Sequence, residues 1–166
     1  YGFVVWEDVK ELSTTASGKE LHSKTHRLLK DRLHLILSKN EITVNKKYWI
    51  TDQESLVKFP VPLKFKHVAS IENSSPQVVF VDKEKLNYPL LLRKWEKGDY
   101  FYPFGMQGKK KLSKFFKDEK MDVLSKEKQW LLCSGDAIVW VLGRRFDERF
   151  KVETTTRQIL KISLLV

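Results

Sequence analysis

The sequence has one cysteine, Cys133, and no apolar run that approaches the roughly 20 residues needed to span a bilayer. A single cysteine excludes an internal disulfide, so the chain does not depend on an oxidising compartment. Cys133 stands in the apolar run Trp130–Cys133, which favours a small buried hydrophobe over a nucleophile or a metal ligand. The first residues do not have the shape of a signal peptide. These absences predict a cytoplasmic protein with no membrane partner.

Patterns that would carry catalysis or hold a metal ion are also lacking. His22 and His26 are four residues apart, but their segment is expected to be extended and has no third ligand nearby. No nucleophile with an adjacent base is recognisable. Gly105 and Gly108 are separated by two residues, where a nucleotide P-loop needs four. The same letters fit the G-x-x-G clamp of KH modules, but that loop joins two helices and an extended segment precedes it here. The sequence therefore predicts no catalytic, cofactor-binding or metal-binding residues.

The length of 166 residues is enough for one good core, or for a core with a small satellite domain. Hydrophobic residues make up 42% of the chain, which indicates a folded protein. The first residue is Tyr1 instead of Met, which predicts that the chain is part of a longer protein. The pattern Asn87-Tyr88-Pro89 interrupts the strands and predicts a boundary between an accessory α+β region, 1–87, and a C-terminal domain, 88–166.

Short apolar segments separated by turn residues predict the fold class. We expect α+β, with short-stranded sheets packed against one or two helices. The most distinct feature is a hairpin, in which Trp130–Cys133 and 137–142 flank the turn Ser134-Gly135-Asp136. The other expected elements are helices over 2–16 and about 110–120, extended segments within 20–50, and strands over 78–81, 90–95 and 158–166.

Acidic residues are fewer than basic ones, 21 against 31, and the imbalance is uneven. Most of the excess lies after residue 90, where 17 basic side chains face 10 acidic ones. Between residues 93 and 117 there are eight Lys or Arg and two acids, with aromatic residues and glycines among them. A cluster of one sign beside aromatic residues suits a polyanion. The sequence therefore predicts an anionic partner for the C-terminal half.

The helix predicted over 110–120 has two faces. Its apolar residues recur at spacings of three and four and are expected to face the core: Leu112, Phe115 and Phe116. Lysines recur on another face: Lys110, Lys114 and Lys117. Basic side chains beside a helix N-terminus suit phosphate, whereas a solvated lysine face is the alternative. Nearby Arg93 and the pair Arg144-Arg145 favour phosphate binding, with Arg144 as the expected outward contact. Asp147 and Glu148 can equally pair with Arg145 and Arg149 and serve the fold alone.

Ordered blocks between residues 90 and 151 resemble the C-terminal domain of the bacterial tRNA(Ile)-lysidine synthetase family. The blocks are Lys97-Gly98-Asp99, Pro103-Phe104-Gly105-Met106, Gly108-Lys109-Lys110-Lys111-Leu112, 138–145 and Asp147-Glu148-Arg149-Phe150. The upstream segment 25–32 resembles the region that precedes this domain in the family. The chain departs from the family pattern at Tyr100, where Arg is frequent, and at Asp122, where Pro is frequent.

The resemblance implies a ligase that forms a carbon–nitrogen bond. The family uses ATP, with Mg²⁺ expected, to join free lysine to the wobble cytidine of the isoleucine tRNA with a CAU anticodon. Its chemistry resides in an N-terminal domain with a Ser-Gly-Gly-x-Asp-Ser loop, which this sequence does not contain. The resemblance therefore implies a tRNA-recognising part that binds no cofactor itself, and a homodimer is a further expectation.

The basic residues expected to face tRNA combine the charge pattern with the resemblance. The main set is Arg93, Lys109, Lys110, Lys111, Lys114, Arg144 and Arg145, and the auxiliary set is Arg27, Lys30 and Arg32. Two other classes fit the same basic surface. One is a non-catalytic RNA-binding module of another RNA-processing protein, and the other is a basic domain that binds an acidic protein.

Overall fold

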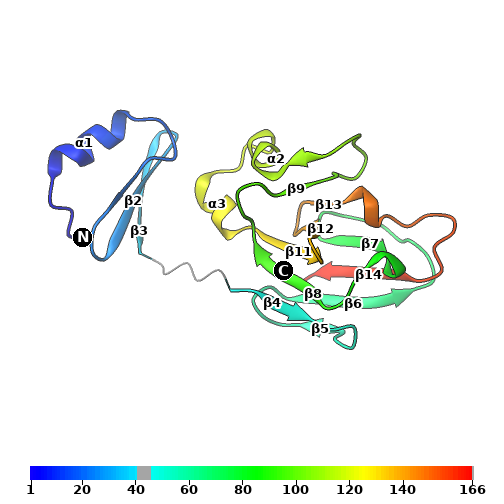
Figure 1. Ribbon diagram of the computed structural model, residues 1–166. Helices are drawn as coiled ribbons and strands as arrows, with labels where there is room; N and C mark the ends of the chain where they lie inside the picture. Colours follow the sequence, from blue (N-terminus) through cyan, green and yellow to red (C-terminus); the bar gives the residue numbers. More distant parts are fainter. Residues whose placement is uncertain (41–45, 166) are drawn as a thin grey trace. The chain divides into compact units, whose positions relative to one another are not determined.

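The computed structural model describes residues 1–40 and 46–165, which divide into two compact units (Figure 1). Unit 1 comprises Tyr1–Val44 with Asp122–Leu124, and unit 2 comprises Asn45–Met121 with Ser125–Val166. This division differs from the boundary expected between residues 87 and 88. Strands from both sides of that boundary share sheets in unit 2, because backbone pairing joins segments that are distant in the sequence.

Unit 1 is a small antiparallel sheet with one helix. Its strands have the order β1-β2-β3, and its elements are α1 (Trp6–Thr14), β1 (Glu20–His22), β2 (His26–Asp31) and β3 (His34–Lys39). The central strand β2 supplies buried Leu28 and Leu29, and α1 supplies buried Leu12. The expected N-terminal helix and extended segments are therefore confirmed within the described residues.

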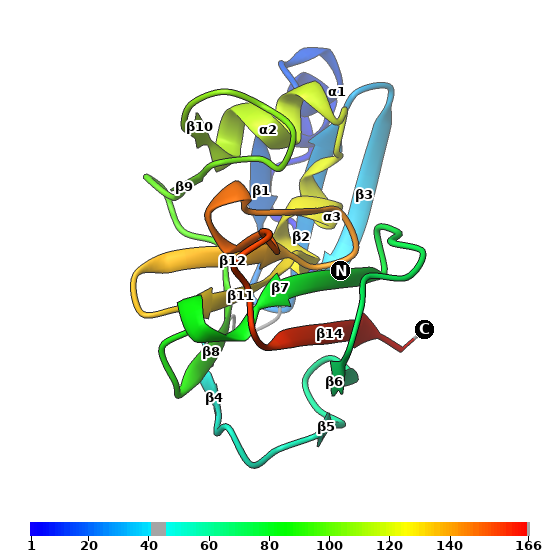
Figure 2. The same cartoon turned by 90° about the vertical axis from the view of Figure 1, so that its right-hand side faces the viewer.

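Unit 2 contains two larger antiparallel sheets and a short ribbon. The five-stranded sheet has the order β13 (Arg145–Phe146), β12 (Ala137–Val141), β11 (Trp130–Ser134), β8 (Leu90–Lys94) and β4 (Tyr48–Ile50). The four-stranded sheet has the order β5 (Leu56–Val57), β6 (Leu63–Val68), β14 (Ile159–Leu164) and β7 (Val78–Asp82), and Figure 2 shows β14 beside β7. The ribbon pairs β9 (Tyr100–Phe101) with β10 (Lys110–Lys111).

The helices of the C-terminal half are short. They are α2 (Leu112–Asp118) and α3 (Val123–Lys128), with 3-10 turns at Lys83–Lys85 and Glu148–Phe150. None of the helices formed by residues 1–40 and 46–165 has the length and apolar character that crossing a bilayer requires. The predicted α+β class, built from short antiparallel strands and few helices, is confirmed.

The central strands of the five-stranded sheet, β8, β11 and β12, are buried on both faces. Side chains alternate between faces along a strand, so Leu90 and Leu92 of β8 join the core shared with the four-stranded sheet. Leu91, between them, joins a second core on the opposite face. This two-sided burial explains why the central strands are continuous apolar runs, and it buries Cys133 in the second core. Burial raises the pKa of the Cys133 thiol to about 11, which keeps it protonated and unreactive near neutral pH.

Helix α2 covers the second core, as its spacing predicts. Leu112, Phe115 and Phe116 are buried there, and Phe116 contacts the Trp95 ring edge-on at 5.3 Å between centroids. The helix begins at Leu112, two residues later than expected, because Lys110 and Lys111 pair with Phe101 and Tyr100 as a strand. The expected hairpin is confirmed, since β11 and β12 pair antiparallel around residues 135–136.

Trp140 is fully buried between the two large sheets, and its indole N–H is unsatisfied. An unpaired buried donor costs about 1–3 kcal/mol, whereas trimming the ring to phenyl leaves a small cavity with an opposing cost. We therefore expect Trp140→Phe to change the free energy of unfolding by less than about 1.5 kcal/mol, against about 3–5 kcal/mol for Trp140→Ala. Urea denaturation followed by far-UV circular dichroism measures both changes. Equal losses of unfolding free energy in Trp140→Phe and Trp140→Ala would contradict the unsatisfied indole N–H.

Candidate nucleic-acid interface

The ten basic residues expected to face a polyanion are distributed over both units, which we describe separately. Arg27 and Lys30 lie on β2 of unit 1, and Arg32 lies in the turn that follows it. The seven others lie in unit 2, on β8, on the β9–β10 ribbon with α2, and around β13. Their environments differ widely, and these differences separate exposed cations from cations that hold the fold together.

The β9–β10 ribbon carries exposed lysines. Lys109 and Lys111 are exposed, and the Lys109 ammonium lies 5.2 Å from the centre of the Tyr100 ring. The loop between the strands turns at Gly105 and Gly108, whose φ values of 78° and 79° suit glycine. The Gly105 N–H donates to Glu148 Oε2 at 2.9 Å, which attaches the loop to the segment after β13.

Helix α2 continues this basic surface. Lys114 is exposed, whereas Lys110 is half-buried and its Nζ lies 2.7 Å from Asp118 Oδ2. The hydrogen bond from Lys110 lowers the pKa of Asp118, and the positive charges of Lys114 and Lys117 act in the same direction. The Leu112 N–H at the start of the helix donates to Asp99 O at 2.8 Å. The first N–H of the helix is therefore already bonded within the protein.

Arg93 is held by Asp99 inside the protein. Two hydrogen bonds of 2.8 Å join the guanidinium to the carboxylate, and each side chain is 14% exposed. Asp99 Oδ2 also accepts the Glu96 N–H at 2.7 Å, so the pair closes the turn before β9. The bond to Asp99 raises the pKa of Arg93, which is the direction expected for a paired guanidinium. Arg93 thus positions the turn from which the ribbon starts.

The two arginines near β13 have different surroundings. Arg144 Nε donates to Gln129 Oε1 at 2.9 Å, and buried Gln129 donates in turn to the carbonyls of Trp130 and Leu142. Arg145 is exposed, and its guanidinium donates to Phe104 O at 3.2 Å. The side chain that is open to solvent is therefore Arg145, while Arg144, expected as the outward contact, is half-buried against Gln129.

Two of the three auxiliary residues of unit 1, Arg27 and Lys30, are half-buried and buried, respectively. Lys30 is only 8% exposed, and Arg27 lies 3.3 Å from Glu20 Oε1 across the β1–β2 pair. Arg32 is exposed in a turn with φ of 50°, and its backbone N–H donates to Ser17 Oγ. Of these three residues, Arg32 is exposed, whereas Arg27 and Lys30 are not.

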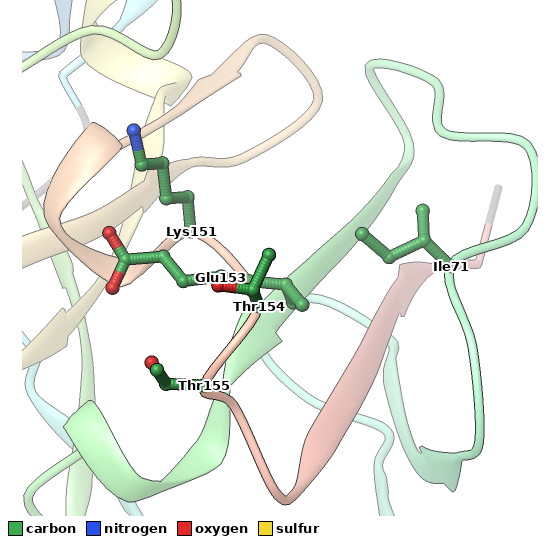
Figure 3. Close-up of a pocket in the computed structure, with 6 residues that line it drawn as sticks. Ile71, Lys151, Glu153, Thr154 and Thr155 are labelled. Atoms are coloured by element: carbon green, nitrogen blue, oxygen red, sulfur yellow. The ribbon is translucent and has the colours of Figure 1, made fainter.

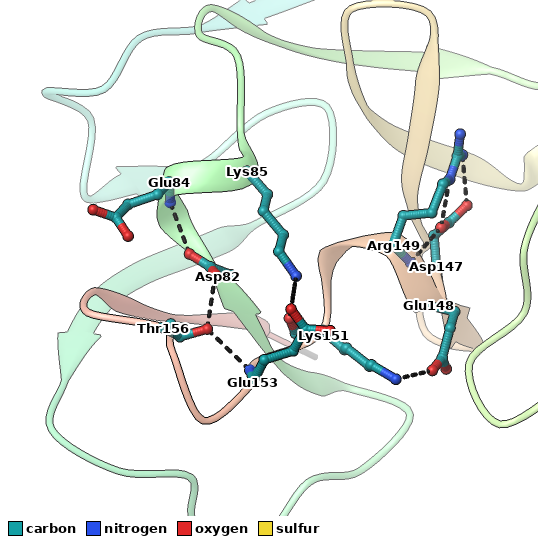
Figure 4. A network of polar contacts seen from close by, with 9 residues as sticks. All are labelled: Asp82, Glu84, Lys85, Asp147, Glu148, Arg149, Lys151, Glu153 and Thr156. Atoms are coloured by element: carbon teal, nitrogen blue, oxygen red, sulfur yellow. Dashed lines mark hydrogen bonds and ion pairs between the residues drawn. The ribbon is translucent and has the colours of Figure 1, made fainter.

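Unit 2 also has a row of contacting cations and aromatic rings that was not among the predicted site residues. The guanidinium of Arg149 lies 4.5 Å from the centre of the Tyr102 ring, and the Tyr102 and Tyr100 rings are 6.3 Å apart. Asp147, fully buried, binds Arg149 through hydrogen bonds to its Nε and Nη2 (Figure 4). This pairing settles one open alternative, since Asp147 pairs with Arg149 and Glu148 with Lys151. The signal in the sequence was the alternation of Tyr100 and Tyr102 beside the lysine cluster.

A surface hollow of about 750 Å³ lies elsewhere on unit 2 (Figure 3). Its lining residues are Ile71, Lys151, Val152, Glu153, Thr154 and Thr155. The charged side chains there are paired within the protein, Lys151 with Glu148 and Glu153 with Lys85. The hollow therefore contributes no free cation for an anionic ligand. Among residues 1–40 and 46–165, no group of three His, Cys, Asp or Glu side chains is placed to hold a metal ion.

The Glu148 carboxylate accepts hydrogen bonds from both the Gly105 N–H and the Lys151 ammonium. The hydrogen bond from Lys151, followed by the Gly105 N–H, lowers the pKa of Glu148 below its usual 4.5. A lowered carboxyl pKa adds stability above the unfolded-state value, and that stability is lost as the pH falls through the folded-state value. We expect Glu148→Gln to flatten the fall in melting temperature between about pH 5 and pH 3. Thermal unfolding of the wild type and of Glu148→Gln at several pH values tests this. Parallel plots of melting temperature against pH for the two proteins would contradict it.

Comparisons with known proteins cover most of the chain. The family model described as the TilS substrate binding domain matches residues 1–40, and that of the TilS substrate C-terminal domain matches residues 90–163. The tRNA(Ile)-lysidine synthase of Parabacteroides distasonis is 41% identical over 99% of this chain and 39% of its own length. That of Bacteroides thetaiotaomicron is 35% identical over 86% of this chain and 32% of its own length. The chain thus spans well under half the length of these relatives.

A solved structure supports the fold independently. The crystal structure of a TILS C-terminal domain aligns with a TM-score of 0.58 at 22% identity, covering 73% of this chain and 99% of that one. At this level of identity the likeness concerns the fold alone.

Proposed function

This chain belongs to the tRNA(Ile)-lysidine synthase family, and we propose that it is the tRNA-recognising C-terminal part of such a ligase. The proposed full-length enzyme joins free lysine to the wobble cytidine of the isoleucine tRNA with a CAU anticodon, using ATP. Its products are lysidine in the tRNA, AMP and pyrophosphate. The modification changes both the codon that the tRNA reads and its amino-acid identity.

The observation that carries the role of this chain is the exposed basic surface of the ribbon and α2. Lys109, Lys111 and Lys114 point to solvent from elements that are tied to a buried core. Exposed lysines on a rigid scaffold supply phosphate affinity through release of counterions, and they set the register of the nucleic acid. Base identity requires further contacts, which lysines alone do not supply.

The chemistry is assigned to other parts of the proposed enzyme. The chain has no Ser-Gly-Gly-x-Asp-Ser loop, so ATP, and Mg²⁺ with it, is proposed to bind outside this chain. Free lysine and a second copy of the protein in a homodimer are the other proposed partners. The reaction acts on tRNA, so we propose a cytoplasmic location.

Binding of the chain to two tRNA transcripts tests this proposal. One is the isoleucine tRNA with the CAU anticodon, and the other is a methionine tRNA that shares this anticodon. Fluorescence anisotropy over a salt series gives both the affinity and the dependence of log K on log salt. If five phosphates are contacted, the slope is expected to be about −4 to −5.

The two transcripts separate recognition from simple charge attraction. A lower Kd for the isoleucine tRNA would support a recognition role, because the anticodon is common to both. Equal Kd values with the same steep slope would restrict the chain to phosphate affinity. No measurable binding at about 50 mM salt would overturn the proposal, because electrostatic affinity is strongest there.

A further inference from the structure

We propose that Tyr100, with Lys109 beside its ring and Arg149 against the neighbouring Tyr102 ring, forms a stacking site for an unpaired nucleotide. The ligand class is single-stranded nucleic acid, with the base on the tyrosine ring and the adjoining phosphates near the two cations. The identity of the nucleic acid as tRNA rests on the proposed function, whereas the preference for an unpaired base rests on the geometry of this surface.

Tyr100 is an exposed aromatic residue on a fixed strand. The residue is 47% exposed, although its backbone belongs to β9 and pairs with Lys111 of β10. The Tyr102 ring meets the Tyr100 ring at 74°, which restricts how far either ring can turn. A ring whose orientation is already restricted loses little conformational entropy when a base stacks on it.

One cation lies against each of the two neighbouring tyrosine rings. The Lys109 ammonium lies 5.2 Å from the centre of the Tyr100 ring, close enough to reach the phosphate of a stacked nucleotide. Arg149 lies against the Tyr102 ring, and its side chain is 40% exposed. The surface therefore combines aromatic faces with positive charge within a few ångströms.

Asp147 positions the second half of this surface. Its carboxylate is fully buried and accepts the Tyr102 N–H at 2.9 Å and the Arg149 N–H at 2.9 Å. It also holds the Arg149 guanidinium with bonds of 2.9 and 2.7 Å. One buried group thus fixes both the backbone at Tyr102, directly after β9, and the Arg149 side chain, so the site is formed before any ligand binds.

The arrangement suits an unpaired base better than a duplex. In a duplex, the base faces are covered by neighbouring bases, and a protein reaches only phosphates and groove edges. An aromatic platform beside lysine and arginine is how proteins bind single strands, because every unstacked base offers a face. A surface that bound only duplex phosphates would gain nothing from two neighbouring tyrosine rings, each with a cation against it.

Two variants at Tyr100 test the stacking role in the full chain. Tyr100→Ala removes the ring and Tyr100→Trp keeps a larger one, while Trp49→Ala is the matched control, because Trp49 is an exposed aromatic residue on β4. The probes are an unstructured RNA of about eight nucleotides and a blunt RNA duplex of equal charge. We expect Tyr100→Ala to weaken single-strand binding by about fivefold to a hundredfold, with Tyr100→Trp and Trp49→Ala near wild type. Duplex binding is expected to change less than twofold.

A third probe separates this inference from the proposed function. The isoleucine tRNA transcript is compared with the same transcript lacking its unpaired 3′ nucleotides, with wild type and Tyr100→Ala. A loss on truncation that Tyr100→Ala abolishes would locate the stacked nucleotide at that end. Equal single-strand binding by wild type and Tyr100→Ala, with melting temperatures unchanged, would overturn the stacking site even if tRNA binds. Absence of tRNA binding would overturn the proposed function, and the short single strand would still decide the stacking site.

Discussion

Replacing Lys109, Lys111 and Lys114 together by glutamate is expected to weaken tRNA binding by more than about a hundredfold at 0.1 M salt. Each phosphate contact contributes about 0.9 units to the slope of log K against log salt, so three lost contacts reduce the slope by about 2.7. The melting temperature should change little, because these side chains are exposed and no ion pair within residues 1–40 and 46–165 involves them. Lys110 is left unchanged because its ammonium pairs with Asp118.

A control with the same change in net charge tests whether position matters. The control residues are three exposed lysines of unit 2, Lys58, Lys64 and Lys66. They lie on or near β6, which belongs to the four-stranded sheet and not to the β9–β10 ribbon. Their replacement by glutamate should reduce the affinity for tRNA by less than about tenfold, because it changes only the overall electrostatic field of the protein. If both triple variants lose affinity equally, the ribbon and α2 are not the contact surface. Anisotropy with the same transcript and salt series gives both values.

Arg93→Ala is expected to lower the free energy of unfolding by about 3–5 kcal/mol. The substitution leaves the Asp99 carboxylate without its bidentate partner in a largely buried position, which is costlier than losing an exposed pair. It also loosens the turn in which Asp99 accepts the Glu96 N–H, and with it the start of the ribbon. Urea denaturation followed by circular dichroism measures the change.

Arg145→Ala is the matched control for this prediction. Arg145 lies on the same sheet, is exposed, and has a hydrogen bond to a carbonyl instead of a carboxylate. Its loss should change stability by no more than about 0.5 kcal/mol. Similar small effects of both substitutions would show that the Arg93–Asp99 pair does not hold the turn. A folded, stable Arg93→Ala that fails to bind tRNA would instead support Arg93 as a direct contact.

The elements that the sequence predicted well are those defined by local patterns. The hairpin of β11 and β12 follows from two apolar runs and a short turn, and the buried face of α2 follows from the spacing of Leu112, Phe115 and Phe116. Such patterns are local because alternation and helical periodicity extend over only a few residues. The strands expected over 78–81 and 90–95 likewise correspond to β7 and β8.

The elements that the sequence predicted less well depend on distant partners. Helix α2 starts at Leu112 because the residues before it pair with β9, ten residues upstream. The compact units divide near residue 45 because β4 pairs with β8 and β14 lies between β6 and β7. The local pattern around residue 87 does not predict these pairings, because hydrogen-bond partners in a sheet depend on the tertiary structure.

The sequence alone determined the net positive charge, its concentration after residue 90, and the resemblance to a family of tRNA-modifying ligases. These are properties of composition and order, which do not depend on how the chain folds. The tertiary structure decided which cations are open to a ligand. Arg93 and Lys111 belong to the same basic cluster in the sequence, but the Arg93 side chain is largely buried and held by Asp99, whereas Lys111 is exposed. Burial and ion pairing depend on neighbours in space, so only the fold separates a structural cation from a binding one.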